Sequence, residues 1–394
     1  MNQRMYGLGS KRSVIREIFE FGKKRAQEVG AENVYDFSLG NPSVKPPLQV
    51  EDVLMQLLRE EDPTALHGYT SAQGDLSVRR AISEYIKDTH HVPCDPDYIY
   101  MTCGAAASLV ISLSAICEEG DEVITFAPYF TEYKVFAETA GAKLVALPSD
   151  PKTFQIDFAL LEKSVNKNTA AVLVNSPNNP SGVVYSEDTV KKLADLLQKK
   201  SAQFGKTIYL VTDEPYRELV YGGVKVPYLT AYYKDTIVCY SYSKSLSLPG
   251  ERIGYIFVNP QAERAKEVYL AVCGAGRAHG YVCAPSLFQK MIARCQGITS
   301  DVSVYEKNRD VLVGALRDFG FECVQPDGAF YLFVKSPEQD ANAFCERAKK
   351  YDLLLVPGDD FGCPGYVRIA YCVSPEMIRR SMPSFKKLAG EYSL

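Results

Sequence analysis

Short apolar runs rich in β-branched residues alternate with longer helical patterns between about residue 98 and residue 260. Four of these runs are EVITF (122–126), AAVLVN (170–175), TIYLVTD (207–213) and TIVCY (236–240). Runs that are apolar on both faces predict strands of a parallel sheet with helices on each side. Polar, glycine or proline residues follow each run. Because ligands bind at this edge of open α/β sheets, we expect the chemistry there.

The stretches between the runs predict helices. Residues 186–205 begin with a serine suited to cap a helix, continue with acidic residues and helically spaced apolar positions, and end at a glycine. The uncharged stretch from Tyr98 to Cys117 is long enough to resemble a membrane span. Since it contains Thr102 and Gly104, we interpret it as strand, turn and helix.

The pattern changes after about residue 280. One amphipathic helix is predicted over residues 285–318, followed by the run FECVQPDGAFYLFV and then by a helix, a strand and another helix. We interpret this part as a smaller α+β layer that the N-terminal segment joins. The predicted division is a large domain at residues 46–279 and a small domain built from residues 1–45 and 280–394.

Composition restricts the class of partner. The chain has 394 residues, and its 44 basic and 48 acidic residues give a formal charge of −4, with the basic residues scattered. This balance predicts no surface for nucleic acid or for an acidic membrane, so we expect small-molecule partners and self-association. Eleven cysteines without a C-x-x-C pair, and a start without an apolar segment, predict reduced thiols in the cytoplasm.

The histidines do not predict a metal site. His67, His90, His91 and His279 lack the spacing of metal ligands. We expect the adjacent pair to lie on a solvated loop.

The segment SYSKSLSLPGERIGY (241–255) follows the fourth run and places Lys244 among serines. A lone lysine in a loop is usually a solvated surface charge. Here the hydroxyls of Ser241 and Ser243 and the guanidinium of Arg252 form a set suited to bind phosphate. An ammonium beside cations has a lowered pKa and becomes a usable nucleophile, so Lys244 is the candidate catalytic residue.

An acidic residue ends the third run. Asp213 follows TIYLVT directly, and Tyr216 comes three residues later. An isolated aspartate in this position is most often a helix N-cap. A carboxylate at the ligand edge can also keep a pyridine nitrogen protonated, which makes the ring an electron sink, and the tyrosine can reach the phenolic oxygen of that ring.

Three further segments end at the same edge. The turn in VNSPNNPSG would aim the Asn179 amide into it, although most such turns are structural. Ala105 and Ala106 open a predicted helix, where free N–H groups can bind an anion and small side chains let it approach. Phe130 follows the first run and can stack on a planar ring, with core packing as the alternative.

Six motifs carry a resemblance to one family over essentially the whole chain. They are SLGNPS, GYTSAQG, NSPNNPSG, TDEPY, SYSKSLSLPGERIGY and YVRIAY. In this order and spacing the chain resembles the class I and II aminotransferases of pyridoxal-phosphate (PLP) fold type I, of the aspartate aminotransferase kind. The resemblance implies an α/β fold with a mostly parallel sheet in a large PLP-binding domain and a smaller α+β domain.

The resemblance also implies cofactor contacts. Lys244 would carry PLP as a Schiff base, Asp213 would pair with the pyridine nitrogen, and Phe130 would stack on the ring. Tyr216 and Asn179 would contact the phenolic oxygen. The phosphate would be held by Ala105, Ala106, Ser241, Ser243 and Arg252.

Substrate and partner contacts follow from the same resemblance. Arg368 in YVRIAY would bind the substrate α-carboxylate through two parallel hydrogen bonds, beside Gly40 and Asn179. Tyr69 would reach the phosphate of a neighbouring subunit, which implies a homodimer with shared active sites. The implied reaction moves an amino group between an L-amino acid and a 2-oxo acid such as 2-oxoglutarate.

The chain departs from the family's commonest forms in three places. It has no tryptophan, so the stacking ring is Phe130. Ala105 and Ala106 replace residues that are often glycine, serine or threonine, which removes a hydroxyl contact but leaves the backbone amides. Tyr133 stands where some members have a histidine behind the aspartate.

Substrate choice stays open. Arg277 lies near the position where dicarboxylate-specific relatives carry a distal arginine from the other subunit. We therefore hypothesise that it binds the distal carboxylate of aspartate or glutamate; the alternative is a surface arginine on an interdomain loop. The same fold and cofactor residues also serve C–S β-lyases and related enzymes acting at Cα, and a non-enzymatic PLP-sensing regulator is a further alternative.

Overall fold

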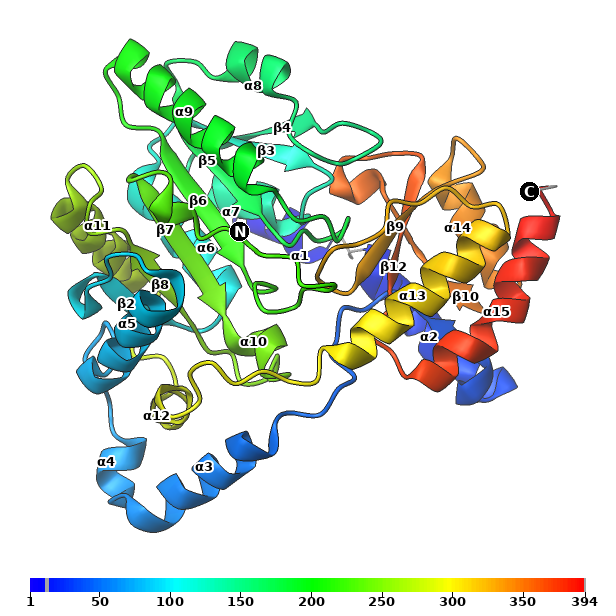
Figure 1. The fold of residues 1–394 in the computed structure, drawn as a ribbon, viewed down its shortest axis with the longest axis horizontal. Helices are drawn as coiled ribbons and strands as arrows, with labels where there is room; N and C mark the ends of the chain where they lie inside the picture. Colours follow the sequence, from blue (N-terminus) through cyan, green and yellow to red (C-terminus); the bar gives the residue numbers. More distant parts are fainter. Residues whose placement is uncertain (11–13, 393–394) are drawn as a thin grey trace.

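The computed structural model describes residues 1–10 and 14–392. Its centre is a sheet with the strand order β2-β8-β7-β6-β5-β3-β4 (Figure 1). Neighbouring strands are parallel, except that β8 runs antiparallel to both of its neighbours. The strands are β2 (Ile99–Thr102), β3 (Glu122–Ala127), β4 (Lys143–Pro148), β5 (Thr169–Asn175), β6 (Tyr209–Glu214), β7 (Thr236–Ser241) and β8 (Gly254–Val258). The four strands predicted from apolar runs and the α/β class are confirmed.

Helices cover both faces of this sheet, which explains why its strands are continuously apolar. All residues of β5 are buried, and alternate side chains face opposite layers. Val172 and Val174 share a core with α9, whereas Leu173 shares one with α6. Between Leu48 and Ala278 the helices are α3 (Leu48–Glu60), α4 (Pro63–His67), α5 (Leu76–His90), α6 (Ala105–Ile116), α7 (Glu132–Thr139), α8 (Phe158–Ser164), α9 (Glu187–Phe204), α10 (Tyr242–Ser245) and α11 (Ala265–Ala278).

Two of the helix predictions are confirmed. Ser186 caps α9 by accepting a hydrogen bond from the Thr189 N–H at 3.1 Å, and Gly205 ends the helix in a left-handed conformation with φ of 60°. The stretch from Tyr98 to Cys117 forms β2, a turn and α6. Within residues 1–10 and 14–392, no helix is both long and apolar enough to cross a membrane.

Two predictions are wrong. The single helix expected over residues 285–318 is two helices, α12 (Ser286–Ala293) and α13 (Ser303–Asp318). The chain turns between them at Gly297, whose φ of 76° favours glycine, and apolar periodicity does not reveal such a turn. His90 does not lie on a solvated loop: it ends α5, and its ring stacks on Tyr228 at a centroid distance of 4.2 Å.

The second layer combines both ends of the chain. β1 (Tyr35–Asp36) pairs in parallel with β10 (Leu353–Leu354). Beside them, β12 (Tyr366–Ala370) lies between β11 (Val356–Pro357) and β9 (Tyr331–Lys335) in an antiparallel sheet. The other elements of the N- and C-terminal parts are α1 (Gln3–Ser10), α2 (Val14–Val29), α14 (Ala341–Lys349) and α15 (Pro375–Gly390) (Figure 1).

The packing of α12 bears on the division into domains. Ala284, Met291 and Cys295 belong to the same apolar core as residues of α3 and α5 in the large layer. In contrast, α13 packs against α15 in the small layer. We therefore propose that the C-terminal part of the small domain begins in the linker 294–302 rather than at residue 280.

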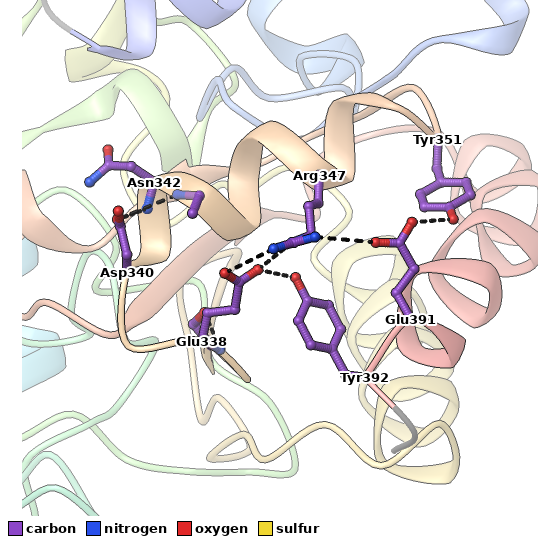
Figure 2. A network of polar contacts seen from close by, with 9 residues as sticks. Glu338, Asp340, Asn342, Arg347, Tyr351, Glu391 and Tyr392 are labelled. Carbon is purple, nitrogen blue, oxygen red and sulfur yellow. Dashed lines mark hydrogen bonds and ion pairs between the residues drawn. The ribbon is translucent and has the colours of Figure 1, made fainter.

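A polar network connects Glu391 and Tyr392, which follow α15, to α14 and the segments beside it (Figure 2). Arg347 Nε donates to Glu338 Oε1 at 2.6 Å, and the Tyr392 hydroxyl donates to the same carboxylate. The Tyr351 hydroxyl donates to Glu391 Oε1 at 2.6 Å, and Glu391 also lies 4.0 Å from Arg347. Single exposed ion pairs contribute little to stability, but here several contacts act on one short segment.

The contribution of the Ser186 cap to the stability of α9 can be tested by substitution. We expect Ser186→Ala to lower the free energy of unfolding by about 1 kcal/mol, because the first turn loses a hydrogen-bond acceptor. Denaturant unfolding followed by circular dichroism measures the change. Ser186→Asp, which keeps an acceptor, should match the parent, and a Ser186→Ala variant as stable as the parent would contradict the role of the cap.

Candidate active site

Predicted site residues from distant segments line one cavity of about 320 Å³ at the carboxyl ends of the parallel strands. Two predicted residues do not line it: Tyr69, which is 99% exposed, and Arg277, which is exposed on α11. The structure brings together Gly40, Ala105, Ala106, Phe130, Asn179, Asp213, Tyr216, Ser241, Ser243, Lys244, Arg252 and Arg368.

The two acids at the end of β6 face opposite sides of the sheet. Asp213 Oδ2 accepts a hydrogen bond from the Tyr133 hydroxyl at 2.6 Å, and both residues are buried. Glu214 Oε2 accepts one from Arg217 Nε at 2.5 Å on the other side. Burial raises the pKa of the Asp213 carboxyl to about 7, although the bond from Tyr133 acts in the opposite direction. Tyr133 therefore occupies the position behind the aspartate that the sequence indicated.

The other oxygen of Asp213 fits the ring nitrogen of PLP. Oδ1 is buried and has no hydrogen-bond partner among the described residues. A buried acceptor without a donor is costly. A protonated pyridine nitrogen would supply both the missing donor and a positive charge, which favours the ionised carboxylate.

A short capped helix turns Lys244 into the cavity. Ser241 Oγ accepts a hydrogen bond from the Ser243 N–H at 3.2 Å and thereby caps α10. The Lys244 ammonium donates to the Gly40 carbonyl oxygen at 2.6 Å. Burial, helped by Arg252 and Arg368, lowers the pKa of Lys244 to about 8. Near neutral pH part of the population is therefore unprotonated and nucleophilic.

The phosphate of PLP fits the far side of Lys244. The Ser241 and Ser243 hydroxyl oxygens lie 2.7 Å apart, and Arg252 Nη1 donates to Ser243 Oγ at 3.4 Å. Gly104 precedes α6 with φ of 87°, and a Cβ there would lie only 2.9 Å from Arg252 Nη2. The glycine thus leaves room for a guanidinium beside the free N–H groups of a helix N-terminus, a combination suited to an anion.

Arg368 on β12 brings a buried positive charge into the cavity. It is 3% exposed, donates from Nη1 to Asn179 Oδ1 at 3.2 Å, and donates from Nη2 to the Ser38 carbonyl oxygen at 2.6 Å. Its Nε is buried without a partner in the part of the chain that the structure describes. Burial lowers the pKa of Arg368. A carboxylate would restore both the missing acceptor and the charge balance.

Sequence reasoning missed six residues that line the cavity, which are Ile15, Leu39, Leu109, Pro215, Pro249 and Tyr331. The Tyr331 hydroxyl lies 3.0 Å from the Tyr216 hydroxyl, and the Tyr331 ring lies 4.7 Å from the Arg368 guanidinium. Its signal was a hydroxyl-bearing ring within the apolar run GAFYLFV. Ile15 and Leu39 come from the N-terminal segment, and no local pattern shows that this segment packs against the cavity.

The raised pKa of Asp213 predicts a pH-dependent stability of the cofactor-free protein. The unfolded carboxyl has a pKa of about 3.9, so the parent loses stability as the pH rises from there through about 7, and Asp213→Asn does not. We therefore expect the asparagine variant to gain thermal stability over the parent increasingly from about pH 5 to about pH 7, and the gain to level off between about pH 7 and about pH 8.

Thermal unfolding of both cofactor-free proteins over this range measures the difference. Glu187→Gln on the exposed start of α9 is the control, because its lowered pKa leaves it ionised throughout and its effect should stay constant. A constant difference for Asp213→Asn would refute the raised pKa.

Comparisons with known proteins test the family. Residues 32–384 match the family model for aminotransferase class I and II. The aspartate aminotransferase of Pyrococcus horikoshii is 29% identical, covering 97% of this chain and 96% of that protein. The aromatic-amino-acid aminotransferase 2 of Thermococcus litoralis is 27% identical, covering 97% of each. The crystal structure of an aminotransferase from Eubacterium rectale matches with a TM-score of 0.98 and 59% identity, covering 100% of this chain and 99% of that one.

These matches confirm the predicted family, PLP as the cofactor and transamination between amino acids and 2-oxo acids as the reaction. They do not favour the alternatives of a C–S β-lyase or a PLP-sensing regulator. The chain belongs to the class I and II aminotransferases, and it is a PLP-dependent enzyme of that family.

Proposed function

We propose that Lys244 carries PLP, that Asp213 holds the ring nitrogen, and that Arg368 binds the substrate α-carboxylate. One observation carries the proposal: a single cavity holds a lysine of lowered pKa together with two buried polar atoms that lack partners among the described residues, Asp213 Oδ1 and Arg368 Nε. The aldehyde of PLP would react with the Lys244 amine, its ring nitrogen would pair with Asp213 Oδ1, and the carboxylate of an amino acid would pair with Arg368 Nε.

The proposed chemistry follows from these positions. When bound, PLP supplies an electron sink for negative charge at the substrate Cα. Asp213 keeps the ring nitrogen protonated, and Arg368 with Asn179 orients the substrate through its carboxylate. In this role the free amine of Lys244 would remove the Cα proton and later return one. A pKa near neutrality suits it to both proton transfers.

A homodimer is part of the proposal. Tyr69 is fully exposed, and the residues that follow it bond to the segment after α11: the Cys283 thiol lies 3.4 Å from the Thr70 carbonyl oxygen. Large apolar side chains are exposed on α3, on the segment around Tyr69, on α11 and on the segment after α11, and exposed apolar surface can mark an interface. They are Leu48, Met55, Leu58, Tyr69, Leu76, Leu270, Tyr281 and Val282.

We also propose that the protein is located in the cytoplasm. All eleven cysteines lie within the described residues, and each is free. Free thiols suit a reducing compartment.

We further propose that Arg277 of the partner subunit binds the distal carboxylate of a dicarboxylic amino acid. The cations that line the cavity of one chain are Lys244, Arg252 and Arg368, and each already has a role. A distal carboxylate therefore needs a cation from elsewhere. Arg277 is exposed and lies on the stretch of chain that the proposed interface includes.

One observation favours a second substrate class. The cavity lining includes the apolar side chains of Ile15, Leu39 and Phe130, which would suit an apolar or aromatic amino acid. The name of the Thermococcus litoralis relative refers to such substrates. An amino-donor screen with 2-oxoglutarate as acceptor separates the two classes.

Replacement of the lysine tests the main proposal. We expect Lys244→Ala to lose the visible absorbance band of enzyme-linked PLP and to lower kcat by at least about 1,000-fold, because nucleophile and proton carrier are both removed. Absorbance spectra and donor turnover measure the two effects. Retention of the band together with full turnover would refute the assignment.

Replacement of the arginine tests the substrate. We expect Arg277→Ala to lower kcat/KM for aspartate about 30-fold or more and to leave alanine turnover unchanged, because only aspartate loses a charge-assisted bond. Mixing Lys244→Ala with Arg277→Ala subunits should restore aspartate turnover, since one site of each mixed dimer is then intact. Equal losses for both amino acids, or an unaffected aspartate reaction, would remove the idea.

A further inference from the structure

Behind the helix that carries Lys244 lies a second, small cavity that the proposed chemistry does not use. Its volume is about 20 Å³, which is room for about one water molecule. Its lining comes from α5, from the segment after β6, from the junction of β7 and α10, from β8, and from the linker between α12 and α13. Its polar lining residues include Tyr85, His90, Glu218, Ser245, Gln296 and Thr299.

Glu218 connects this cavity to the Lys244 helix through a chain of hydroxyls. The Tyr240 hydroxyl donates to Glu218 Oε1 at 2.9 Å and lies 3.1 Å from Ser245 Oγ. A phenol has one proton to give, and here it goes to the carboxylate. The Ser245 hydroxyl must then donate to Tyr240, so the chain runs from Ser245 through Tyr240 to Glu218.

The helix at the end of this chain has little stability of its own. α10 contains only four residues, from Tyr242 to Ser245, and so short a helix depends on contacts outside itself. Ser245 supplies two such contacts. Its hydroxyl bonds to Tyr240, and its carbonyl oxygen accepts a hydrogen bond from the Ser300 N–H at 2.7 Å. Since Lys244 directly precedes Ser245, these bonds also restrain the backbone of Lys244, from which its side chain extends into the active site.

Glu218 is not accounted for by ion pairing. The neighbouring Arg217 is already bonded to Glu214, and Glu218 Oε2 is buried without a partner among the residues described. Burial raises the pKa of Glu218 to about 7. On the other side of the same segment, Tyr216 lines the active-site cavity, so the segment faces both cavities within three residues.

We propose that Glu218 is a positioning residue for Lys244, which it holds in place from behind through Tyr240 and Ser245. The inference rests on the proposed role of Lys244. Because one segment carries both Tyr216 and Glu218, the bonds beside the small cavity would also fix the position of Lys244 relative to Tyr216. One water molecule in the cavity would complete the hydrogen bonds of Glu218 Oε2.

The test measures how fast Lys244 captures the cofactor. Cofactor-free enzyme is mixed with PLP, and the appearance of the visible band of lysine-linked PLP is followed by stopped-flow absorbance. We expect Glu218→Leu, Tyr240→Phe and Ser245→Ala each to slow capture about 10-fold, because each breaks the same chain. Glu218→Gln keeps an acceptor and should capture at nearly the parent rate. The double variant Glu218→Leu/Tyr240→Phe should be no slower than either single variant.

Matched controls separate positioning from folding. Tyr233→Phe also removes a buried tyrosine hydroxyl, one that donates to the Ile208 carbonyl oxygen at 2.7 Å outside both cavities, and it should capture PLP at the parent rate. Circular dichroism identifies any variant that does not fold. If Glu218→Leu does not fold, Tyr240→Phe and Ser245→Ala still break the chain by removing one oxygen each.

The outcomes distinguish this inference from the proposed function. If Lys244→Ala forms the band as the parent does, the role of Lys244 is wrong. If Lys244→Ala forms no band while the three chain variants capture at the parent rate, only the positioning role is overturned. Additive slowing in the double variant would overturn it as well.

Discussion

Adjacent side chains at the end of a strand must point to opposite faces of the sheet, and the active site depends on this constraint at β6. Asp213 faces the layer of α6 and α7, and Glu214 faces the layer that holds Arg217. A one-residue shift in the register of β6 would exchange the two acids. The face of the sheet at the active-site cavity would then carry Glu214, the acid that bonds to Arg217. The pairing of β6 with β5 and β7 fixes the register and prevents this exchange.

The two acids differ in how completely the protein satisfies them. Glu214 has an arginine and the Thr212 hydroxyl as partners. Asp213 has one phenol and one open oxygen. A buried acid with an unpaired oxygen destabilises the cofactor-free protein, and in the proposed role of Asp213 a cationic ring nitrogen would remove this cost. The proposed role of Arg368 rests on the same argument, since its guanidinium is buried with Nε unpaired among the described residues, and a substrate carboxylate would supply the missing acceptor.

Much of this arrangement could be predicted from the sequence because it rests on local signals. Four of the strands that pair in parallel, β3, β5, β6 and β7, were predicted from apolar runs, and the polar residues directly after each run lie at the same edge by topology alone. The fifth, β4, was not predicted, because most of its residues are only partly buried or exposed. The family motifs then gave Arg368 and Gly40, which no local pattern would have brought to that edge.

Contacts made only by tertiary packing could not be predicted. Ile15 and Leu39 line the cavity from an N-terminal segment, and the sequence pattern of that segment does not predict where it packs. The ring of His90 is stacked on Tyr228, more than a hundred positions away in the chain, so its sequence neighbours could not show its burial. The link from Glu218 to Ser245 likewise joins two segments that are separate in sequence, and each looks ordinary alone.

The antiparallel strand β8 has a consequence for the order in which the site is assembled. β7, α10 and β8 are consecutive, and β7 pairs directly with β8, so the segment that contains Lys244 forms through contacts between near neighbours in the sequence. Arg368 comes from near the end of the chain and must meet Asn179 over a long loop. Contacts of short separation close with less loss of chain entropy. During synthesis from the N-terminus, the residues proposed to bind the cofactor therefore leave the ribosome well before Arg368, which is proposed to bind the substrate.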